Sequence, residues 1–412
     1  MLNKLRGIVF AAVIAMLLFA PLGIKALQVI GIPLPSSIGA NAVSSQLEWR
    51  QFAKFPAISF DSVASGSFQK GFESYLSDRI PFRDEVVLAN AAAQRDCIAL
   101  ANLPFAYEAY PTYFESQVLS LPNYHALSHF PSKRAECEKG IDEYASGLHA
   151  VASNHPDTRF IVMVVDWSNS SIANPAYELA SDVWTTDMTC NAFSNAFSDL
   201  ENVRVVSAQY EKTDEYYQDF FETDHHWNIN GVSKAYELLV EQLGFQKLNL
   251  ASTKPLENLH FSGSYARTGR IRAAEEVVFD TTQSFENLTL NNSDGSSETG
   301  DEHVFFHQKY GGTEWDDFHG SYYGTASSVT SIESEQTGAA VLILDSYGSS
   351  IKRPIAENYG KLYCYPDMHS SSKSSDLRLT SRIDMPDVKD VIIVACTEDF
   401  VTQAKRMPQY FE

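Results

Sequence analysis

The sequence predicts an α/β fold, a parallel sheet with helices on its faces. Four short apolar runs are rich in β-branched residues and show no alternation with polar ones, which is typical of strands buried on both faces. These runs are Phe160–Val165, Val203–Val206, Ala340–Leu344 and Val391–Val394. Helical patterns separate them, including residues 133–153 and the segment after residue 228, and such an order favours parallel strands.

Composition bounds the class of protein. The chain has 412 residues, 44% of them hydrophobic and 20% charged, which suffices for a large core. Its formal net charge is −21, without a lysine or arginine cluster to offset it. Such a charge repels phosphate backbones, so nucleic acid is not expected as a partner.

Five scattered cysteines form no CxxC pair, which argues against a zinc ribbon or a thioredoxin-like motif. We expect buried, unreactive thiols. A single bridge such as Cys97 to Cys137 is the alternative in an oxidising compartment.

The amino terminus has the layout of a secretory signal or a signal anchor. Lys4 and Arg6 precede the uncharged apolar run Gly7–Ile24, which is near the lower length limit for crossing a bilayer. No clear small-x-small cleavage site follows, so we expect a single-pass anchor in the cell membrane. The alternative is a cleaved signal and a secreted protein. Either would place the rest of the chain outside the cytoplasm.

The sequence divides into three expected parts. Residues 1–27 form the anchor or signal peptide, and residues 28–64 a juxtamembrane stalk with serine-rich stretches and the prolines Pro33 and Pro35 near its start. Residues 65–412 form one catalytic domain with inserted loops. Polar composition predicts solvated loops at residues 283–302, 325–338 and 369–376.

The segment Asp-His-His-Trp at residues 224–227 comes directly before a helix, for which Asn230 is the expected N-cap and Gly244 the end. Residues two apart on an extended loop point to the same side, so the Asp224 carboxylate can reach the ring of His226. A carboxylate there fixes the imidazole tautomer and stabilises the imidazolium. The alternative is a pair of hydrogen-bonded loop histidines without a catalytic role.

A serine follows one of the predicted strands. Ala340–Leu344 runs into Asp345 and Ser346, and a glycine-containing turn and a short helix come next. The amides of a helix N-terminus can stabilise an oxyanion. A serine hydroxyl is a weak nucleophile without a nearby base, so the histidine segment is its natural complement. Alternatively, the two residues only cap the helix.

Together these segments resemble the bacterial DHHW family, which is similar to the alginate O-acetylation proteins with SGNH hydrolase-like domains. The resemblance rests on Asp-His-His-Trp followed about 120 residues later by a strand and Asp-Ser-Tyr-Gly. In those relatives, too, the Asp-x-His element precedes the serine. The resemblance extends over about residues 48–400 and includes three further segments, Phe72–Asp84, Phe261–Ser264 and Tyr322–Gly324.

The resemblance implies an SGNH hydrolase-like fold and a triad of Ser346 as nucleophile, His226 as base and Asp224 as the acid that orients it. Oxyanion or substrate contacts are assigned to Tyr347, Gly324 and Arg267. The chain departs from the usual SGNH pattern, because Leu344 stands where a glycine precedes Asp-Ser, and the asparagine that donates to the oxyanion has no clear counterpart.

The implied activity is acyl-ester chemistry outside the cytoplasm, either O-acetyl transfer to a cell-surface or exported polysaccharide or its deacetylation. A separate multispanning membrane protein would supply the acetyl group, and no cofactor is implied. The alternative is a catalytically silent, polysaccharide-binding scaffold.

A zinc site at Asp224, His225 and His226 is a further alternative. Adjacent histidines on an extended loop are expected to point in opposite directions, and no HExxH spacing occurs, so we expect no metal. His225 is expected to be structural or to support the catalytic residues from behind, and Trp227 to pack at the start of the helix.

Overall fold

A computed structural model of the chain describes residues 43–45, 47–121, 126–128, 133–179, 181–250, 260–272, 275–276, 283–302, 314–315, 318–324, 329–366 and 379–404, with a few isolated positions before residue 33. The chain forms two compact units. The first comprises Met1–Ala101, Thr112–Phe114 and Arg270–Arg272, and the second comprises the remaining residues. No helix in the described ranges is long and apolar enough to cross a membrane. The predicted anchor, Gly7–Ile24, lies outside the described residues except for single positions.

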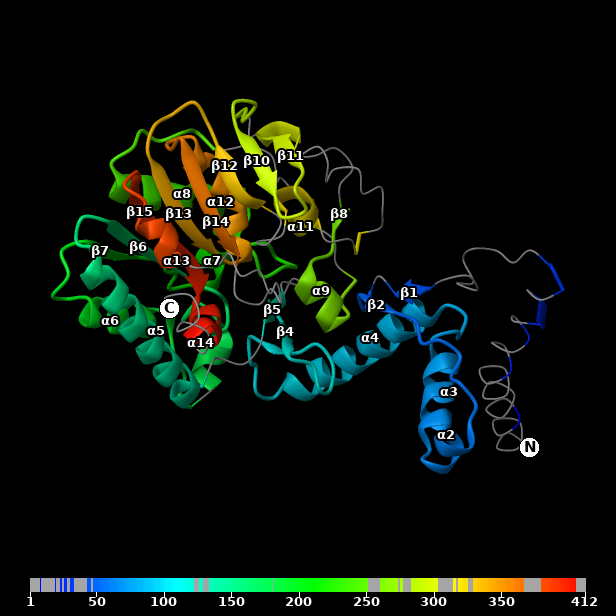
Figure 1. Cartoon of the computed structure of the whole chain (residues 1–412). Helices are drawn as coiled ribbons and strands as arrows, with labels where there is room; N and C mark the ends of the chain where they lie inside the picture. Colours follow the sequence, from blue (N-terminus) through cyan, green and yellow to red (C-terminus); the bar gives the residue numbers. More distant parts are fainter. Residues whose placement is uncertain are drawn as a thin grey trace. The chain divides into compact units, whose positions relative to one another are not determined.

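In its described residues, the first unit contains a small hairpin and the helices α2, α3 and α4 (Figure 1). Its elements are β1 (Ser44–Ser45), β2 (Arg50–Gln51), α2 (Phe60–Ala64), α3 (Ser67–Ser77) and α4 (Arg83–Asn102). Asp78 belongs to Phe72–Asp84, the amino-terminal signature of the resemblance. It is buried and accepts hydrogen bonds from Arg50 at 2.9 and 2.5 Å and from the Ala53 amide at 2.7 Å. These contacts, the Arg50 guanidinium first, lower the pKa of Asp78. The signature therefore contributes an ion pair to this unit.

The second unit is built on an eight-stranded sheet with the order β11-β10-β12-β14-β13-β15-β6-β7 (Figure 1). The strands β14, β13, β15, β6 and β7 run parallel to their neighbours in that order, whereas β12, β10 and β11 continue the sheet antiparallel. The parallel strands are β6 (Arg159–Val165), β7 (Val203–Val206), β13 (Ala339–Leu344), β14 (Lys361–Pro366) and β15 (Val388–Cys396). The antiparallel strands are β10 (Thr289–Asn292), β11 (Ser297–Thr299) and β12 (Val329–Glu333). The predicted α/β fold and all four predicted strands are confirmed.

The remaining elements of this unit cover the sheet or extend from its edges. The helices are α5 (Arg134–Asn154), α6 (Thr186–Ala196), α7 (Thr213–Asp219), α8 (Ile229–Leu243), α9 (Ser264–Gly269), α11 (Phe318–Tyr323), α12 (Ser346–Ala356), α13 (Leu379–Ile383) and α14 (Thr397–Ala404), with a 3₁₀ turn at Pro175–Leu179. Two small antiparallel sheets contain β3 (Tyr110–Pro111), β4 (Val118–Ser120) and β5 (Ala126–Ser128), and β8 (His260–Phe261) and β9 (Glu275–Glu276).

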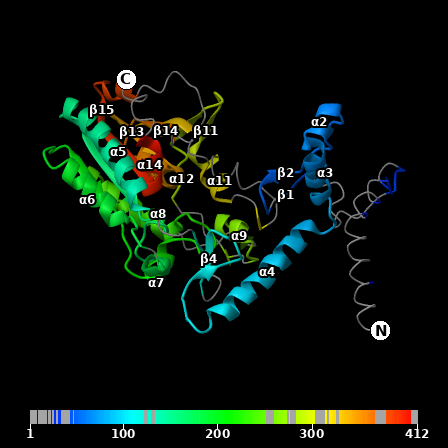
Figure 2. The same cartoon turned by 90° about the horizontal axis from the view of Figure 1, so that it is seen from below.

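The sheet separates two hydrophobic cores. Along β6, Phe160, Val162 and Val164 enter the core that contains side chains of α5, α6 and α14. The intervening residues of β6 enter the opposite core, which contains side chains of α8 and α12. Figure 2 shows α5 and α6 side by side. Because both faces of the strand are buried from Phe160 to Val165, all six of these residues are apolar, and this explains why the sequence shows no alternation there.

The helix after Asp-His-His-Trp begins two residues earlier than predicted. Asn228, not Asn230, is its N-cap, because the Asn228 side chain accepts hydrogen bonds from the amides of Asn230 and Gly231 at 2.9 and 3.3 Å. Gly244 ends the helix in the left-handed conformation with φ of 74°, as expected.

Two predicted loops are strands instead. Residues 283–302 hold the hairpin β10–β11, because Leu288 and Leu290 are fully buried and Gly295 takes φ of 87° in the turn. Residues 325–338 hold β12, whose Ile332 is fully buried. In both segments, the burial of a few apolar residues in the core decided the structure, although most of the residues are polar. Residues 369–376 lie outside the described residues.

All five cysteines lie in described segments and are thiols, so the Cys97–Cys137 bridge is not formed. Cys137, Cys364 and Cys396 are buried as expected, but Cys97 is exposed and Cys190 is partly exposed.

Candidate active site

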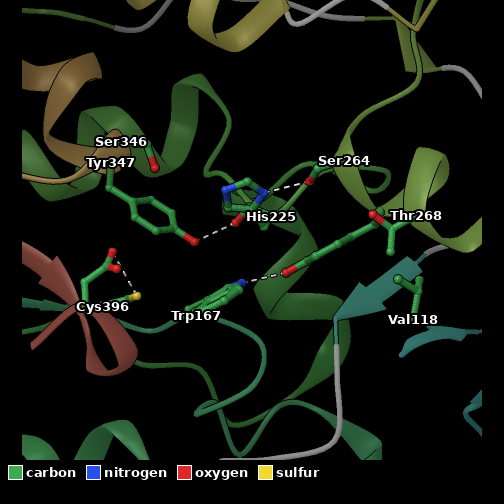
Figure 3. Close-up of a pocket in the computed structure, with 10 residues that line it drawn as sticks. Val118, Trp167, His225, Ser264, Thr268, Ser346, Tyr347 and Cys396 are labelled. Carbon is green, nitrogen blue, oxygen red and sulfur yellow. Dashed lines mark hydrogen bonds between the residues drawn. The ribbon is translucent and has the colours of Figure 1, made fainter. Parts of the chain in front are cut away.

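A cavity of about 340 Å³ lies where several strands of the second unit end. Ser346 follows β13, Cys396 ends β15, and Trp167 follows β6. In parallel α/β sheets, ligands bind outside the carboxyl ends of the strands. The other residues lining the cavity are Val118, His225, Ser264, Tyr265, Thr268, Tyr347 and Asp399 (Figure 3).

Ser346 is the first residue of α12. Asp345 caps this helix, accepting hydrogen bonds through Oδ1 from the amides of Tyr347 and Gly348 at 2.8 and 3.2 Å, and through Oδ2 from the Cys396 amide at 3.1 Å. The turn needs glycine at position 348, because a side chain there would collide with Leu344. Asp345 therefore caps the helix, which was the alternative role given to both residues, whereas Ser346 lines the cavity.

Asp224 and His226 form a short hydrogen bond. His226 Nδ1 lies 2.6 Å from Asp224 Oδ1, and the His226 amide donates to the same oxygen at 3.0 Å. Burial would raise the pKa of Asp224, but His225 and His226 beside it and the hydrogen bonds that it accepts hold that pKa well below its usual value. The carboxylate therefore stays ionised and holds a proton on Nδ1.

Phe261–Ser264, the Gly-Ser segment, positions Asp224 from the other side. The Ser264 amide donates to Asp224 Oδ2 at 2.6 Å, and the Gly263 amide donates to the Thr223 hydroxyl at 3.0 Å. A side chain at Gly263 would collide with Asp224. Glycine is required because the two backbones approach so closely.

Two further hydrogen bonds fasten the histidine segment to the helix that carries Ser346. The Tyr347 hydroxyl donates to the His225 carbonyl at 2.8 Å, and Trp227 Nε1 donates to Ser350 Oγ at 2.7 Å. Trp227 is buried, and its Cβ lies against Gly231 in the first turn of α8, which confirms its predicted packing at the start of that helix. Two segments about 120 residues apart in the sequence thus meet at one site.

The predicted triad is not a continuous hydrogen-bonded chain. His226 Nε2 is buried and accepts or donates no hydrogen bond within the described part of the chain. Ser346 and His226 therefore both lie at the amino-terminal end of α12, but no hydrogen bond joins them. His226 does not line the cavity, whereas Ser346 does.

His225 was expected to be structural, yet its ring lines the cavity between Ser346 and Ser264 (Figure 3). Its Nδ1 lies 2.7 Å from Ser264 Oγ. The expectation that the adjacent histidines point apart is wrong, since their ring centroids are 3.8 Å apart. One potential ligand atom from each of Asp224, His225 and His226 lies within 4.8 Å of the others, so ring direction does not argue against a metal. The 2.6 Å separation of Asp224 and His226 is that of a hydrogen bond.

Of the three residues to which the resemblance assigns oxyanion or substrate contacts, one lines the cavity and two do not. Tyr347 lines the cavity. The Arg267 guanidinium donates to the Trp315 carbonyl at 3.2 Å, and Gly324 follows α11 with φ of 72°. Neither Arg267 nor Gly324 belongs to the described lining of the cavity.

The sequence did not single out Trp167 and Tyr265 as site residues. Trp167 Nε1 donates to the Tyr265 hydroxyl at 2.6 Å, and the two aromatic rings both line the cavity. Cys396 and Asp399 form another part of the lining, with a thiol-to-carboxylate distance of 3.5 Å. Trp167 and Cys396 could have been found from the rule that carboxyl ends of parallel strands share one edge.

We expect His225 to make stability depend on pH. Burial first, and His226 second, lower the pKa of His225 to about 3. In the unfolded chain a histidine has a pKa of about 6.5. The unfolded chain therefore binds a proton that the folded chain does not bind between these values, so stability is lost as the pH falls from about 6.5 to about 3.

His225→Phe should reduce this slope by up to about 1.4 kcal/mol per pH unit, measured by urea unfolding at several pH values. The slope should not vanish, because burial also lowers the pKa of His319. The exposed His260, replaced by phenylalanine, is the control. An unchanged slope in His225→Phe would contradict the expectation.

The second unit is an α/β domain with a serine at the start of the helix that follows a central parallel strand, and with an Asp–His pair beside it. No family model and no curated protein matches the sequence. Among solved structures, a DHHW family protein from Eubacterium siraeum superposes with a TM-score of 0.53 at 18% identity, over 71% of this chain and 95% of that chain. The chain is therefore similar in fold to a DHHW family protein, which confirms the resemblance stated from the sequence.

Two other solved structures show lower similarity. PatB1 from Bacillus cereus with a sulfonyl adduct gives a TM-score of 0.49 at 18% identity, over 69% of this chain and 96% of that chain. The O-acetyltransferase domain of AlgJ from Pseudomonas putida gives 0.37 at 10% identity, over 71% and 99%.

Proposed function

We propose that the protein is a serine acyltransferase or esterase that carries an acetyl group on Ser346. The observation that carries the proposal is the Asp224–His226 pair, with 2.6 Å between carboxylate and ring, fastened to the helix that begins at Ser346. The Nε2 atom of His226 has no other hydrogen-bond partner among the described residues. An uncommitted Nε2 on an oriented imidazole is what a general base requires.

In the first half-reaction, Ser346 Oγ attacks the carbonyl carbon of an acetyl ester while His226 Nε2 takes the hydroxyl proton. Asp224 stabilises the imidazolium that forms. Collapse of the tetrahedral intermediate breaks the ester bond, and His226 returns the proton to the leaving alkoxide. In the second half-reaction a hydroxyl group attacks the acetyl-serine, with the same histidine as base. Ser346 must reach His226 Nε2 for this to happen, and substrate binding would bring them together, because catalytic hydrogen bonds often tighten only in the complex.

The acceptor in this proposal is a sugar hydroxyl of a polysaccharide outside the cytoplasm, or water. Trp167, Tyr265 and Tyr347 supply aromatic surface, and Ser264 and Thr268 supply hydroxyl groups. This mixture suits a ring that has apolar faces and hydroxyl edges. The donor would be a membrane protein that supplies acetyl groups, and the amino-terminal segment would hold the enzyme near it.

The test is to trap the acyl-enzyme. The full chain is incubated with p-nitrophenyl acetate in excess chelator, quenched with acid, digested and analysed by mass spectrometry. We expect one acetyl group on the peptide that contains Ser346, and none there in Ser346→Ala. Acetylation elsewhere only, or a rate abolished by the chelator and restored by zinc, would overturn the proposal.

The second candidate is a polysaccharide-binding scaffold without turnover. It is favoured by the missing hydrogen bond between Ser346 and His226 within the described residues. A scaffold would bind a polysaccharide equally well with and without Ser346 Oγ and would form no acyl-enzyme.

A further inference from the structure

His226 has a second imidazole stacked on its face. The ring of His319 lies 3.5 Å from the ring of His226, centroid to centroid, and the two planes differ by 6°. His319 is 2% exposed and His226 is 7% exposed. Both Nε2 atoms are buried without a hydrogen-bond partner among the described residues.

A shared metal does not account for this pair. An imidazole binds a metal along the lone pair of its nitrogen, in the plane of the ring, at about 2.0–2.1 Å for zinc. Two stacked, nearly parallel rings with centroids 3.5 Å apart cannot both have one ion in their planes. The stack is therefore a contact between faces.

The helix that carries His319 is fixed to the other parts of the site. Nζ of the buried Lys352, on the helix of Ser346, donates to the Tyr323 carbonyl at the end of α11 at 2.7 Å. At the start of α11, Phe318 packs edge-on against Phe261, with centroids 5.8 Å apart. Phe261 stands two residues before Gly263, whose neighbour Ser264 holds Asp224. His319 is thus tied to the nucleophile helix on one side and to the Gly-Ser segment on the other.

From this arrangement we infer that His319 is a positioning residue for His226, in a reaction that rests on the function proposed above. The Asp224 carboxylate restrains the His226 ring in its own plane, through Nδ1. The flat face of His319 restrains it against rotation out of that plane. Both restraints are needed to aim Nε2 at the serine hydroxyl.

The stacked ring must also be uncharged. When His226 accepts a proton, a neutral aromatic face beside it is favourable, whereas a second positive charge would oppose protonation. Burial and the neighbouring His226 keep the pKa of His319 well below its usual value. The other titratable groups that act on His319 are Asp224, His225 and Lys352.

The experiment compares His319→Phe, which keeps a flat ring, with His319→Leu, which does not. For p-nitrophenyl acetate hydrolysis we expect kcat of the phenylalanine variant to stay within about threefold of wild type. The leucine variant should lose about 10- to 100-fold in kcat with KM unchanged, since a misplacement of about 1 Å can cost that much. His319→Met is measured in the same way if the leucine variant unfolds.

A second readout does not depend on turnover. The proton between His226 Nδ1 and Asp224 should give a proton resonance downfield of the amide region, absent in His226→Gln. It should persist in His319→Phe and be broadened or lost in His319→Leu. A leucine variant equal to wild type in both readouts would overturn the inference, as would a phenylalanine variant as impaired as leucine.

Ser346→Ala and His226→Gln separate this inference from the proposed function. If they hydrolyse the ester as fast as wild type, the proposed function fails, and the resonance alone then decides whether His319 positions His226. If they are inactive while His319→Leu is fully active with an unchanged resonance, only the positioning role fails.

Discussion

Ser346→Ala is expected to lower kcat/KM for ester hydrolysis by at least about 1,000-fold, because removing a nucleophile that acts with its base abolishes the covalent route. The same change should leave the free energy of unfolding within about 0.5 kcal/mol of wild type. The Ser346 side chain is only partly buried and lines the cavity, so its replacement by alanine leaves no void in the core. Steady-state kinetics and urea unfolding of the same preparation measure the two effects.

Ser349→Ala is the matched control for this change. Ser349 lies one turn further along the same helix, is buried, and donates only a long hydrogen bond of 3.5 Å to the Asp345 carbonyl. We expect it to retain the activity of wild type. Equal loss in both variants would mean that the helix, not the nucleophile, had been disturbed, and equal retention would remove Ser346 from the mechanism.

The parallel centre of the fold was predictable because its strands are buried on both faces, and an apolar run such as Phe160–Val165 has no other simple interpretation. The antiparallel extension was not predictable. In β10 and β12, a few apolar residues such as Leu290 and Ile332 do the packing within a polar composition. Only the finished core shows that these residues are buried. Sequence composition averages over such a segment and misses it.

The candidate site also has a part that was predictable from the sequence and a part that was not. Asp224 and His226 were predictable because their contact spans two residues and depends on local geometry. The relation of His226 to Ser346 and His319 is a tertiary one, fixed by hydrogen bonds such as Trp227 to Ser350 and Lys352 to Tyr323. The sequence contains no local pattern for these contacts. The place of His225 in the cavity lining was not predictable for the same reason, since it depends on where α9 and α12 lie.

The second large effect is expected for Asp224→Asn. The Asp224 carboxylate is the acceptor in each of its hydrogen bonds among the described residues. Oδ1 accepts two from His226, and Oδ2 accepts one from the Ser264 amide. An asparagine has one acceptor oxygen and one donor NH₂ group. If the NH₂ group takes the place of Oδ2, it opposes the Ser264 amide, donor against donor.

If instead the NH₂ group takes the place of Oδ1, it opposes the His226 amide and can be satisfied by the ring only when Nδ1 is unprotonated. The proton then resides on Nε2, and the lone pair that must accept the serine proton is lost. We therefore expect kcat to fall by about 10⁴-fold and stability by about 1–3 kcal/mol. Asp187→Asn is the control, because Asp187 is exposed on α6 and pairs only with Asn191 among the described residues. Activity of Asp224→Asn within tenfold of wild type would show that His226 does not depend on this carboxylate for its tautomer, and the base would then have to be sought in the cavity itself, where His225 faces Ser346.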